Sequence, residues 1–253
     1  MTRDCRNRSG GFSLLELLIA IGIIALLIGL LMPVVGMVRR SAHAARCLAN
    51  LQQWGQAYQM YLNANGGRSF IIGELPTHKN NMNTPPMWWE LLQPYQQVAG
   101  QMLLCGEASD PADTTPSNAF QAWGPQSFFD SPTKIRGPFV GSYGFNSWLY
   151  QPHQTEDGSP PAESIRLPTK EASRVPVIVD CARLDLNPSD TDEPYLYEAK
   201  KGKGAMRWAA LERHKDGVNA LFLDGHAEQV SVPGLWKLKW SETFQPKEVT
   251  LQK

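Results

Sequence analysis

The sequence predicts an α+β protein in which a long N-terminal helix, first transmembrane and then amphipathic, packs on an antiparallel, β-rich globular head. Three patterns carry this prediction: an apolar run at residues 12–32, an apolar stripe with helical spacing after it, and a hairpin pattern at residues 217–232. The chain has 253 residues, with 24 basic and 24 acidic side chains. This balance fits one membrane-tethered domain and gives no sign of the basic face that a nucleic-acid partner requires.

The apolar run contains a single charged side chain, Glu16. About twenty residues at ~1.5 Å each span the ~30 Å hydrocarbon layer of a bilayer, so residues 12–32 are predicted to form a transmembrane helix. A carboxylate in such a helix costs about 2.5–3.5 kcal/mol, and Glu16 therefore calls for a partner charge or a protonated state. A secretory signal peptide would also start with basic residues, but its apolar region is shorter and its small residues follow that region, whereas here they precede it at residues 9–11.

The helical pattern continues beyond the apolar run. Pro33 is predicted to bend the helix, because proline removes one backbone N–H and its ring clashes with the preceding turn. Apolar side chains then follow at steps of three and four, and they are Cys47, Leu48, Leu51, Trp54, Tyr58, Tyr61 and Leu62. A glycine-rich stop at residues 63–67 ends the pattern. We therefore expect one helix over residues 12–65, followed by a head over residues 66–253.

The head is expected to be built from short strands between loops. Strands are predicted at residues 102–105, 139–150 and 176–181, and a helical turn is predicted at residues 87–92. Near the C-terminus, residues 217–223 and 226–232 have strand patterns. The Asp224-Gly225 turn signal between them predicts a β-hairpin.

Residues 10–17, Gly-Gly-Phe-Ser-Leu-Leu-Glu-Leu, resemble the processing site of type IV prepilins and type II secretion pseudopilins. The resemblance implies that a prepilin peptidase removes residues 1–11 as a cytoplasmic leader, cutting between Gly11 and Phe12, and that the new amine of Phe12 is methylated. Glu16 matches the glutamate at the fifth mature position, and Pro33 matches a helix-bending proline. On the grounds of charge, we expect the Glu16 carboxylate of one subunit to meet the Phe12 amine of its neighbour; the alternative is a Glu16 near the interface that headgroup water hydrates. The resemblance also implies a single pass through the inner membrane, with the N-terminus in the cytoplasm and a periplasmic, extracytoplasmic head.

A second resemblance involves the hairpin. His214, followed after nine residues by Asp224-Gly225, resembles the signature of a large bacterial family of pilin-like proteins with prepilin-type N-termini. Residues 46–51 partly match that family's Arg-Cys-x-Asn-x-Leu segment, and residues 105–111 loosely match its Cys-Pro-x-Asp element. We interpret His214, Asp224 and Gly225 as a structural feature of the hairpin, in preference to a metal or catalytic cluster with Asp216 and His226.

Cysteines and acidic residues suggest two further sites. If Cys5 leaves with the leader, the three remaining cysteines lie in an oxidising compartment, and we favour a disulfide between Cys47 and Cys105 that joins the helix to the head. Cys181 is then expected to be buried and free, although spacing leaves the connectivity open. Oxygen donors that suit Ca²⁺ lie close together in one loop, and they are Asp185, Asn187, Asp190 and Asp192. A solvated acidic loop is the preferred interpretation, so no cofactor is expected.

The predicted function is structural. The sequence has no nucleophile elbow, P-loop, zincin helix or dinucleotide fingerprint, and an enzyme is not expected. The resemblance implies a pilin-like subunit that joins other pilin or pseudopilin subunits in a type II secretion pseudopilus or a type IV pilus-like filament. The alternative is a membrane-anchored extracytoplasmic binding protein that is processed like a prepilin but does not polymerise.

Overall fold

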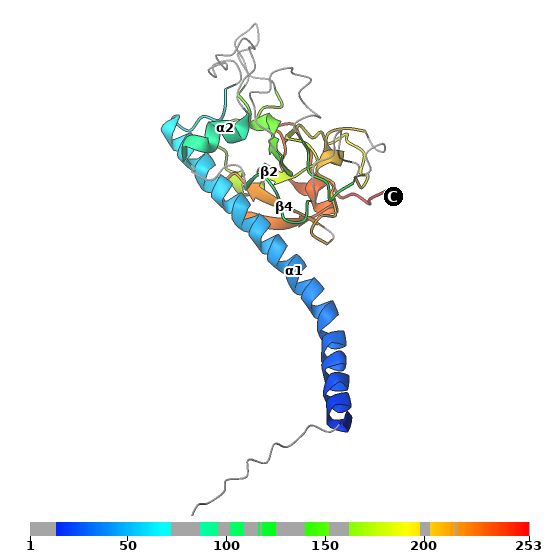
Figure 1. Ribbon diagram of the computed structural model, residues 1–253. Helices are drawn as coiled ribbons and strands as arrows, with labels where there is room; N and C mark the ends of the chain where they lie inside the picture. Colours follow the sequence, from blue (N-terminus) through cyan, green and yellow to red (C-terminus); the bar gives the residue numbers. More distant parts are fainter. Residues whose placement is uncertain are drawn as a thin grey trace, which may run out of the picture. The chain divides into compact units, whose positions relative to one another are not determined.

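A computed structural model describes residues 14–71, 87–95, 102–108, 116, 118–124, 140–151, 162–197, 203–215 and 217–252. The chain divides into two compact units, Met1–Ala42 and His43–Lys253. The second unit contains the sheet and the C-terminal part of the long helix (Figure 1). The predicted α+β class is confirmed, because a long N-terminal apolar helix precedes a mostly antiparallel sheet.

The long helix, α1, spans Leu14–Ala64 and passes through Pro33 without interruption. The predicted glycine-rich stop ends it. Gly66 and Gly67 have φ angles of 65° and 78°, a left-handed conformation that glycine adopts without a steric penalty. The N–H of Gly67 donates to the carbonyl of Leu62 at 2.7 Å, which closes the last turn.

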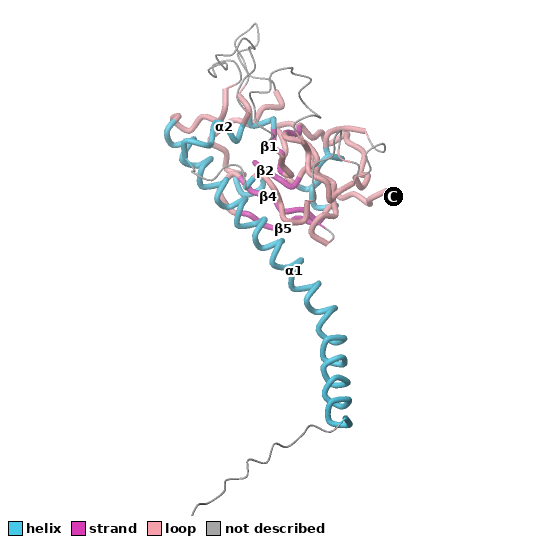
Figure 2. Tube along the Cα trace, in the orientation of Figure 1, coloured by secondary structure: helices cyan, strands magenta, loops and turns pink. Residues whose placement is uncertain are grey.

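The sheet has five strands in the order β3-β1-β2-β4-β5, and Figure 2 shows β1, β2, β4 and β5 side by side. The strands are β1 (Tyr143–Asn146), β2 (Pro176–Asp180), β3 (Asp185–Leu186), β4 (Gly217–Phe222) and β5 (Ala227–Ser231). Only the β1–β3 pair is parallel among these strands. The predicted hairpin is present as β4 and β5, in register from Gly217 opposite Ser231 to Leu221 opposite Ala227.

Both faces of the sheet are buried over β1, β2 and β4, whereas most residues of the edge strand β5 are exposed. Leu221 of β4 belongs to the hydrophobic cluster that contains the α1 residues Leu51, Trp54 and Tyr58. Its neighbour Phe222 belongs to a second cluster, formed largely by the C-terminal part of the chain. Successive side chains of a strand point to opposite faces, so α1 covers one face and C-terminal segments cover the other. The short helix α2 (Trp88–Leu92), at the predicted helical turn, adds its two tryptophans to the first cluster.

Two strand predictions need correction. Residues 102–105 form a turn and not a strand, although Met102, Leu103 and Cys105 are buried; a short apolar run alone cannot distinguish these two structures. Of the expected strand at residues 139–150, the described residues form a strand only at Tyr143–Asn146. Ser147–Leu149 forms a 3₁₀ turn, η3, capped by the Asn146 side chain, which accepts a hydrogen bond from the N–H of Trp148 at 3.1 Å. Residue 139 lies outside the described residues.

Candidate functional site

The N-terminal part of α1 is apolar on all sides. Every side chain from Leu14 to Pro33 is solvent-exposed in the isolated chain. Glu16, in the first turn, is the one charged residue among them. By length and composition, α1 can cross a membrane. Gly11 and Phe12, the predicted cleavage pair, lie outside the described residues.

Within the second unit, a disulfide between Cys47 of α1 and Cys105 ties the helix to a loop. The two Cα atoms are 5.2 Å apart, and the bond joins residues separated by 58 positions. This is the pair favoured from the sequence. Beside it, the Nδ1 atom of His43 lies 3.0 Å from the Glu107 carboxylate. Cys181 is free and fully buried, and burial raises the pKa of its thiol to about 12, which makes it unreactive.

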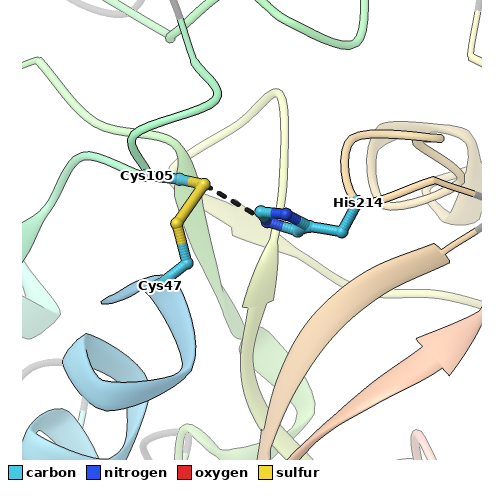
Figure 3. A group of neighbouring side chains, drawn as sticks. All are labelled: Cys47, Cys105 and His214. Atoms are coloured by element: carbon cyan, nitrogen blue, oxygen red, sulfur yellow. Dashed lines mark hydrogen bonds between the residues drawn. A yellow bond between two sulfur atoms is a disulfide. The ribbon is translucent and has the colours of Figure 1, made fainter. Parts of the chain in front are cut away.

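His214 lies directly against this disulfide (Figure 3). Its Nε2 atom is 3.2 Å from the Cys105 sulfur and 3.1 Å from Oδ2 of Asp180, which ends strand β2. The backbone N–H of His214 donates to the carbonyl of Gly217, where β4 begins. The imidazole is therefore held between the sheet and the disulfide, and all of these side chains are buried.

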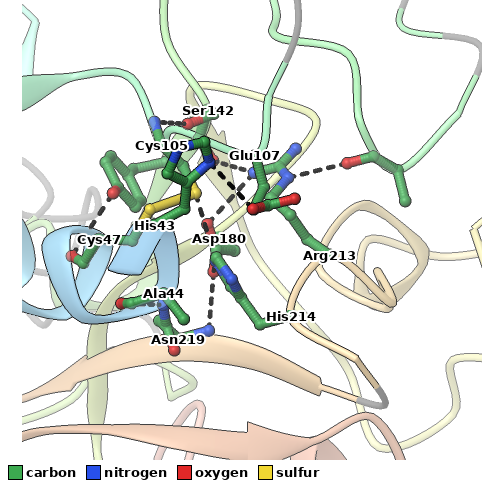
Figure 4. The surroundings of a disulfide bond; sticks show 12 residues. His43, Ala44, Cys47, Cys105, Glu107, Ser142, Asp180, Arg213, His214 and Asn219 are labelled. Carbon is green, nitrogen blue, oxygen red and sulfur yellow. Dashed lines mark hydrogen bonds and ion pairs between the residues drawn. A yellow bond between two sulfur atoms is a disulfide. The ribbon is translucent and has the colours of Figure 1, made fainter. Parts of the chain in front are cut away.

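Asp180 is the centre of a buried polar network (Figure 4). Its carboxylate accepts hydrogen bonds from Nη1 of Arg213 at 3.2 Å and from the backbone N–H of Asn219 at 2.7 Å. Burial raises the pKa of Asp180, but the contacts with His214, Arg213 and the Asn219 N–H outweigh burial and hold this pKa below its usual value. The Asn219 side chain also donates to the carbonyl of Ala44 in α1, at 3.5 Å. The network thus connects β2, β4 and the helix.

Comparison with known proteins identifies the N-terminal segment. Residues 6–32 match the family model for the prokaryotic N-terminal methylation motif. The chain carries the prepilin-type motif of type IV pilin-like proteins. No curated protein and no solved structure gives a match. The matched segment includes Gly11, Phe12 and Glu16 and ends before the head begins.

The hairpin signature does not form one cluster. His214 lies in the buried network, whereas Asp224 and Gly225 form the exposed turn between β4 and β5. Gly225 has a φ of 94°, which favours glycine, and the Asp224 carboxylate contacts both the N–H and the Nδ1 atom of His226. Asp216 lies outside the described residues. Strand β4 makes up six of the nine residues between His214 and Asp224, so the spacing carries the chain from the buried network to the turn.

The acidic loop uses its carboxylates mainly for contacts within the chain. Asp192 accepts hydrogen bonds from the backbone N–H groups of Ser189 and Met206, at 3.2 and 2.7 Å. Asp185 lies in β3, and burial raises its pKa. Asn187 is exposed, and the remaining candidate ligand, Asp190, accepts from the Ser189 hydroxyl at 3.4 Å. Neither the solvated loop that the sequence favours nor the alternative of calcium binding is tested by these contacts.

Sequence reasoning missed Asp180 and Arg213. A signal was available, because Asp180 directly follows the apolar strand Val177-Ile178-Val179 and a charge at that position is expected to have a partner. Nothing local identifies the partner, which lies 33 residues later in the chain.

Proposed function

We propose that this chain is a pilin-like structural subunit. Prepilin peptidase cuts between Gly11 and Phe12, the amine of Phe12 is methylated, and the mature chain joins other pilin or pseudopilin subunits in a type II secretion pseudopilus or type IV pilus-like filament. The observation that carries this proposal is the methylation motif at residues 6–32, which includes the apolar N-terminal part of α1. The motif suggests a structural subunit and not an enzyme.

The exposure of the N-terminal part of α1 supports assembly. An apolar helix without a polar face requires an apolar environment, which lipid supplies before assembly and neighbouring helices supply within a filament. In this proposal residues 1–11 face the cytoplasm and the head lies on the opposite, periplasmic side of the inner membrane.

Glu16 has a specific role in this proposal. Its carboxylate pairs with the methylated amine of Phe12 on a neighbouring subunit, so that two charges at membrane depth compensate each other and fix the register of the subunits. The pairing concerns assembly, and cleavage after Gly11 does not depend on it.

Processing and assembly are tested separately. Intact-mass and N-terminal peptide analysis of the membrane-extracted protein should give a chain that starts at a methylated Phe12, and a mature start beyond residue 32 would refute the processing step. Glu16→Ala and Glu16→Gln should both be cleaved normally but should be almost absent from sheared filaments, whereas the neighbouring Leu17→Ala should be incorporated. Normal incorporation of Glu16→Ala would refute the pairing. A processed wild-type chain that never enters filaments would favour the anchored binding protein.

A further inference from the structure

The imidazole of His214 makes its polar contact with one of the two bonded sulfurs. Its Nε2 atom lies 3.2 Å from the sulfur of Cys105, and Figure 3 shows the ring directed at that sulfur. Of the two sulfurs, only this one has such a contact among the residues that the structure describes. Cys47 is contacted through its backbone, where its carbonyl accepts a hydrogen bond from the Tyr143 hydroxyl at 3.5 Å. The two halves of the disulfide therefore have different surroundings.

The contact between His214 and Asp180 places a hydrogen on Nε2. Oδ2 of Asp180 lies 3.1 Å from this nitrogen. Burial raises the pKa of Asp180, but its hydrogen bonds and Arg213 outweigh burial and keep that pKa below its usual value. A carboxylate can only accept hydrogen bonds, so we infer that Nε2 carries the hydrogen in the neutral ring as well as in the charged one. The Cys105 sulfur thus faces an N–H donor.

The charged groups near this donor are already paired. The Asp180 carboxylate lies 3.2 Å from the guanidinium of Arg213, and both side chains are fully buried. Beside the disulfide, the carboxylate of Glu107 lies 3.0 Å from the imidazole of His43. Tyr143 is neutral, because burial raises the pKa of its hydroxyl. A negative charge that develops on the sulfur next to the N–H donor is therefore stabilised by that donor, while both carboxylates already have partners.

The two cysteines are also held differently. The backbone N–H of Cys105 donates to the Ser142 hydroxyl at 2.6 Å, directly before β1. Cys47 lies on α1, where the hydrogen bonds to the head are longer: the carbonyls of Ala44 and Cys47 each accept one at 3.5 Å. Both cysteines are fully buried, so exchange with an external thiol requires a local opening. An opening at this part of α1 exposes Cys47 and leaves Cys105 against His214.

We propose that thiol–disulfide exchange at this bond has a fixed direction, in which Cys47 is the sulfur that is attacked and Cys105 is the sulfur that leaves. An incoming thiolate forms a new S–S bond with Cys47, the Cys47–Cys105 bond breaks, and its electron pair stays on Cys105, where the His214 N–H stabilises it. In the closing direction a small-molecule disulfide first forms a mixed disulfide with Cys47. The Cys105 thiolate then attacks Cys47, and the small thiolate leaves.

His214 thus has a part in closing the bond that joins α1 to the head. The inference concerns the head alone and does not depend on filament assembly.

The test identifies the sulfur that is attacked. The oxidised full chain in detergent is treated with glutathione, the reaction is quenched with acid, and peptides from a pepsin digest are analysed by mass spectrometry. We expect glutathione on Cys47 at least about 10-fold more often than on Cys105, because a hydrogen bond to the charged sulfur favours its departure. Glutathione mainly on Cys105, or equally on both, would overturn the proposal.

Two substitutions separate the effect of the His214 N–H from that of the opening at α1. His214→Leu removes the donor, so the preference for Cys47 should fall by about 10-fold. His214→Gln places an amide N–H at a similar reach and should keep most of the preference. His226→Ala removes an exposed histidine of the hairpin turn and should behave as the wild type does.

The variants also show how the proposal fails. An unchanged preference in His214→Leu would overturn it, because the opening at α1 alone would then choose the sulfur. A loss in His214→Gln as large as that in His214→Leu would overturn the role of the N–H. The readout is a ratio of two products from one chain, so a general change in the rate of opening does not alter it. If His214→Leu does not fold, the wild type in urea gives the same comparison: the preference should vanish on unfolding, and its persistence would overturn the proposal.

Discussion

The two parts of α1 differ in how their apolar side chains are covered. From Leu14 to Met32 these side chains are exposed within the chain, whereas beyond His43 the residues Leu51, Trp54 and Tyr58 are buried against the head. A helix that is apolar all round needs an apolar environment, but a helix with one apolar stripe needs only a partner on one side. The chain itself therefore stabilises the C-terminal part of α1, while the N-terminal part depends on its surroundings.

The glycines of α1 show the same contrast. A Cβ atom added at Gly22, Gly29 or Gly36 would meet nothing within 4 Å, whereas one added at Gly55 would lie 2.6 Å from Cδ1 of Leu221. Glycine in a helix interior costs about 0.5–1 kcal/mol relative to alanine. At Gly55 the missing side chain allows α1 to approach β4 closely, which accounts for a glycine at this position. At the other three positions, no contact among the described residues requires a glycine.

The largest effect expected from this comparison is that of Trp54→Ala. Trp54 is fully buried, packs edge-to-face on Trp88 at 5.1 Å, and donates its ring N–H to the carbonyl of Met102. Its removal should lower the free energy of unfolding of the head by about 3–5 kcal/mol. Leu26→Ala, in the exposed part of α1, should leave the thermal unfolding of the head unchanged. Near-UV circular dichroism of the full chain in detergent measures both, and equal destabilisation by the two variants would show that the two parts of α1 do not differ in their contribution to the stability of the head.

A smaller loss is expected at the polar centre of the head. Asp180→Asn leaves the buried Arg213 without a counter-charge, which should cost about 3 kcal/mol, at the low end of the usual range because the amide oxygen still accepts hydrogen bonds. Asp224→Asn is the matched control, since this aspartate also contacts a histidine but is exposed, and such surface pairs contribute about 0–1 kcal/mol. Urea unfolding of both variants at neutral pH measures the difference. Similar midpoints would show that the buried network does not stabilise the head.

The parts of the fold that could be predicted from the sequence depend on local patterns. The apolar run, the stripe that ends at Leu62 and the Asp224-Gly225 turn each lie within a short window, and their geometry follows from helical or strand periodicity. These patterns were enough for the α+β class, for most of α1 and for the β4–β5 hairpin. The methylation motif, also local, was recognised for the same reason.

The rest depends on contacts between distant residues. The two-residue strand β3 exists because Asp185 and Leu186 pair with β1, about forty residues earlier in the chain, and nothing in their own sequence indicates this. The Asp180–Arg213 pair and the position of His214 against Cys105 likewise require the sheet to be in place first. For the cysteines, composition and compartment suggested a disulfide, but only the fold brings Cys47 and Cys105 together with an imidazole.

The smallest expected effect is that of Gly55→Ala. The same substitution at Gly36, in the other part of α1, is its control, so the two variants compare the covered and the exposed part of one helix directly. In Gly55→Ala, the new Cβ must displace Leu221, which should cost about 1–3 kcal/mol, and the better helix propensity of alanine offsets up to about 1 kcal/mol of that. A net loss near 1 kcal/mol lowers the melting temperature of a head of this size by about 2–4 °C. Gly36→Ala, with open space around its Cβ, should leave that temperature unchanged.

The cause of the Gly55→Ala loss can be separated from any general effect on the helix. Leu221→Val removes the Cδ1 atom that the new methyl group would meet, so the double variant should be more stable than the sum of the two single losses predicts. The coupling energy is the difference between the loss in the double variant and the sum of the two single losses. It reports the contact between α1 and β4 alone, because the helix propensity at position 55 is the same whether residue 221 is leucine or valine. Strict additivity would show that the close approach at Gly55 is not what limits the helix there, and the contrast between the two parts of α1 would then rest on side-chain burial alone.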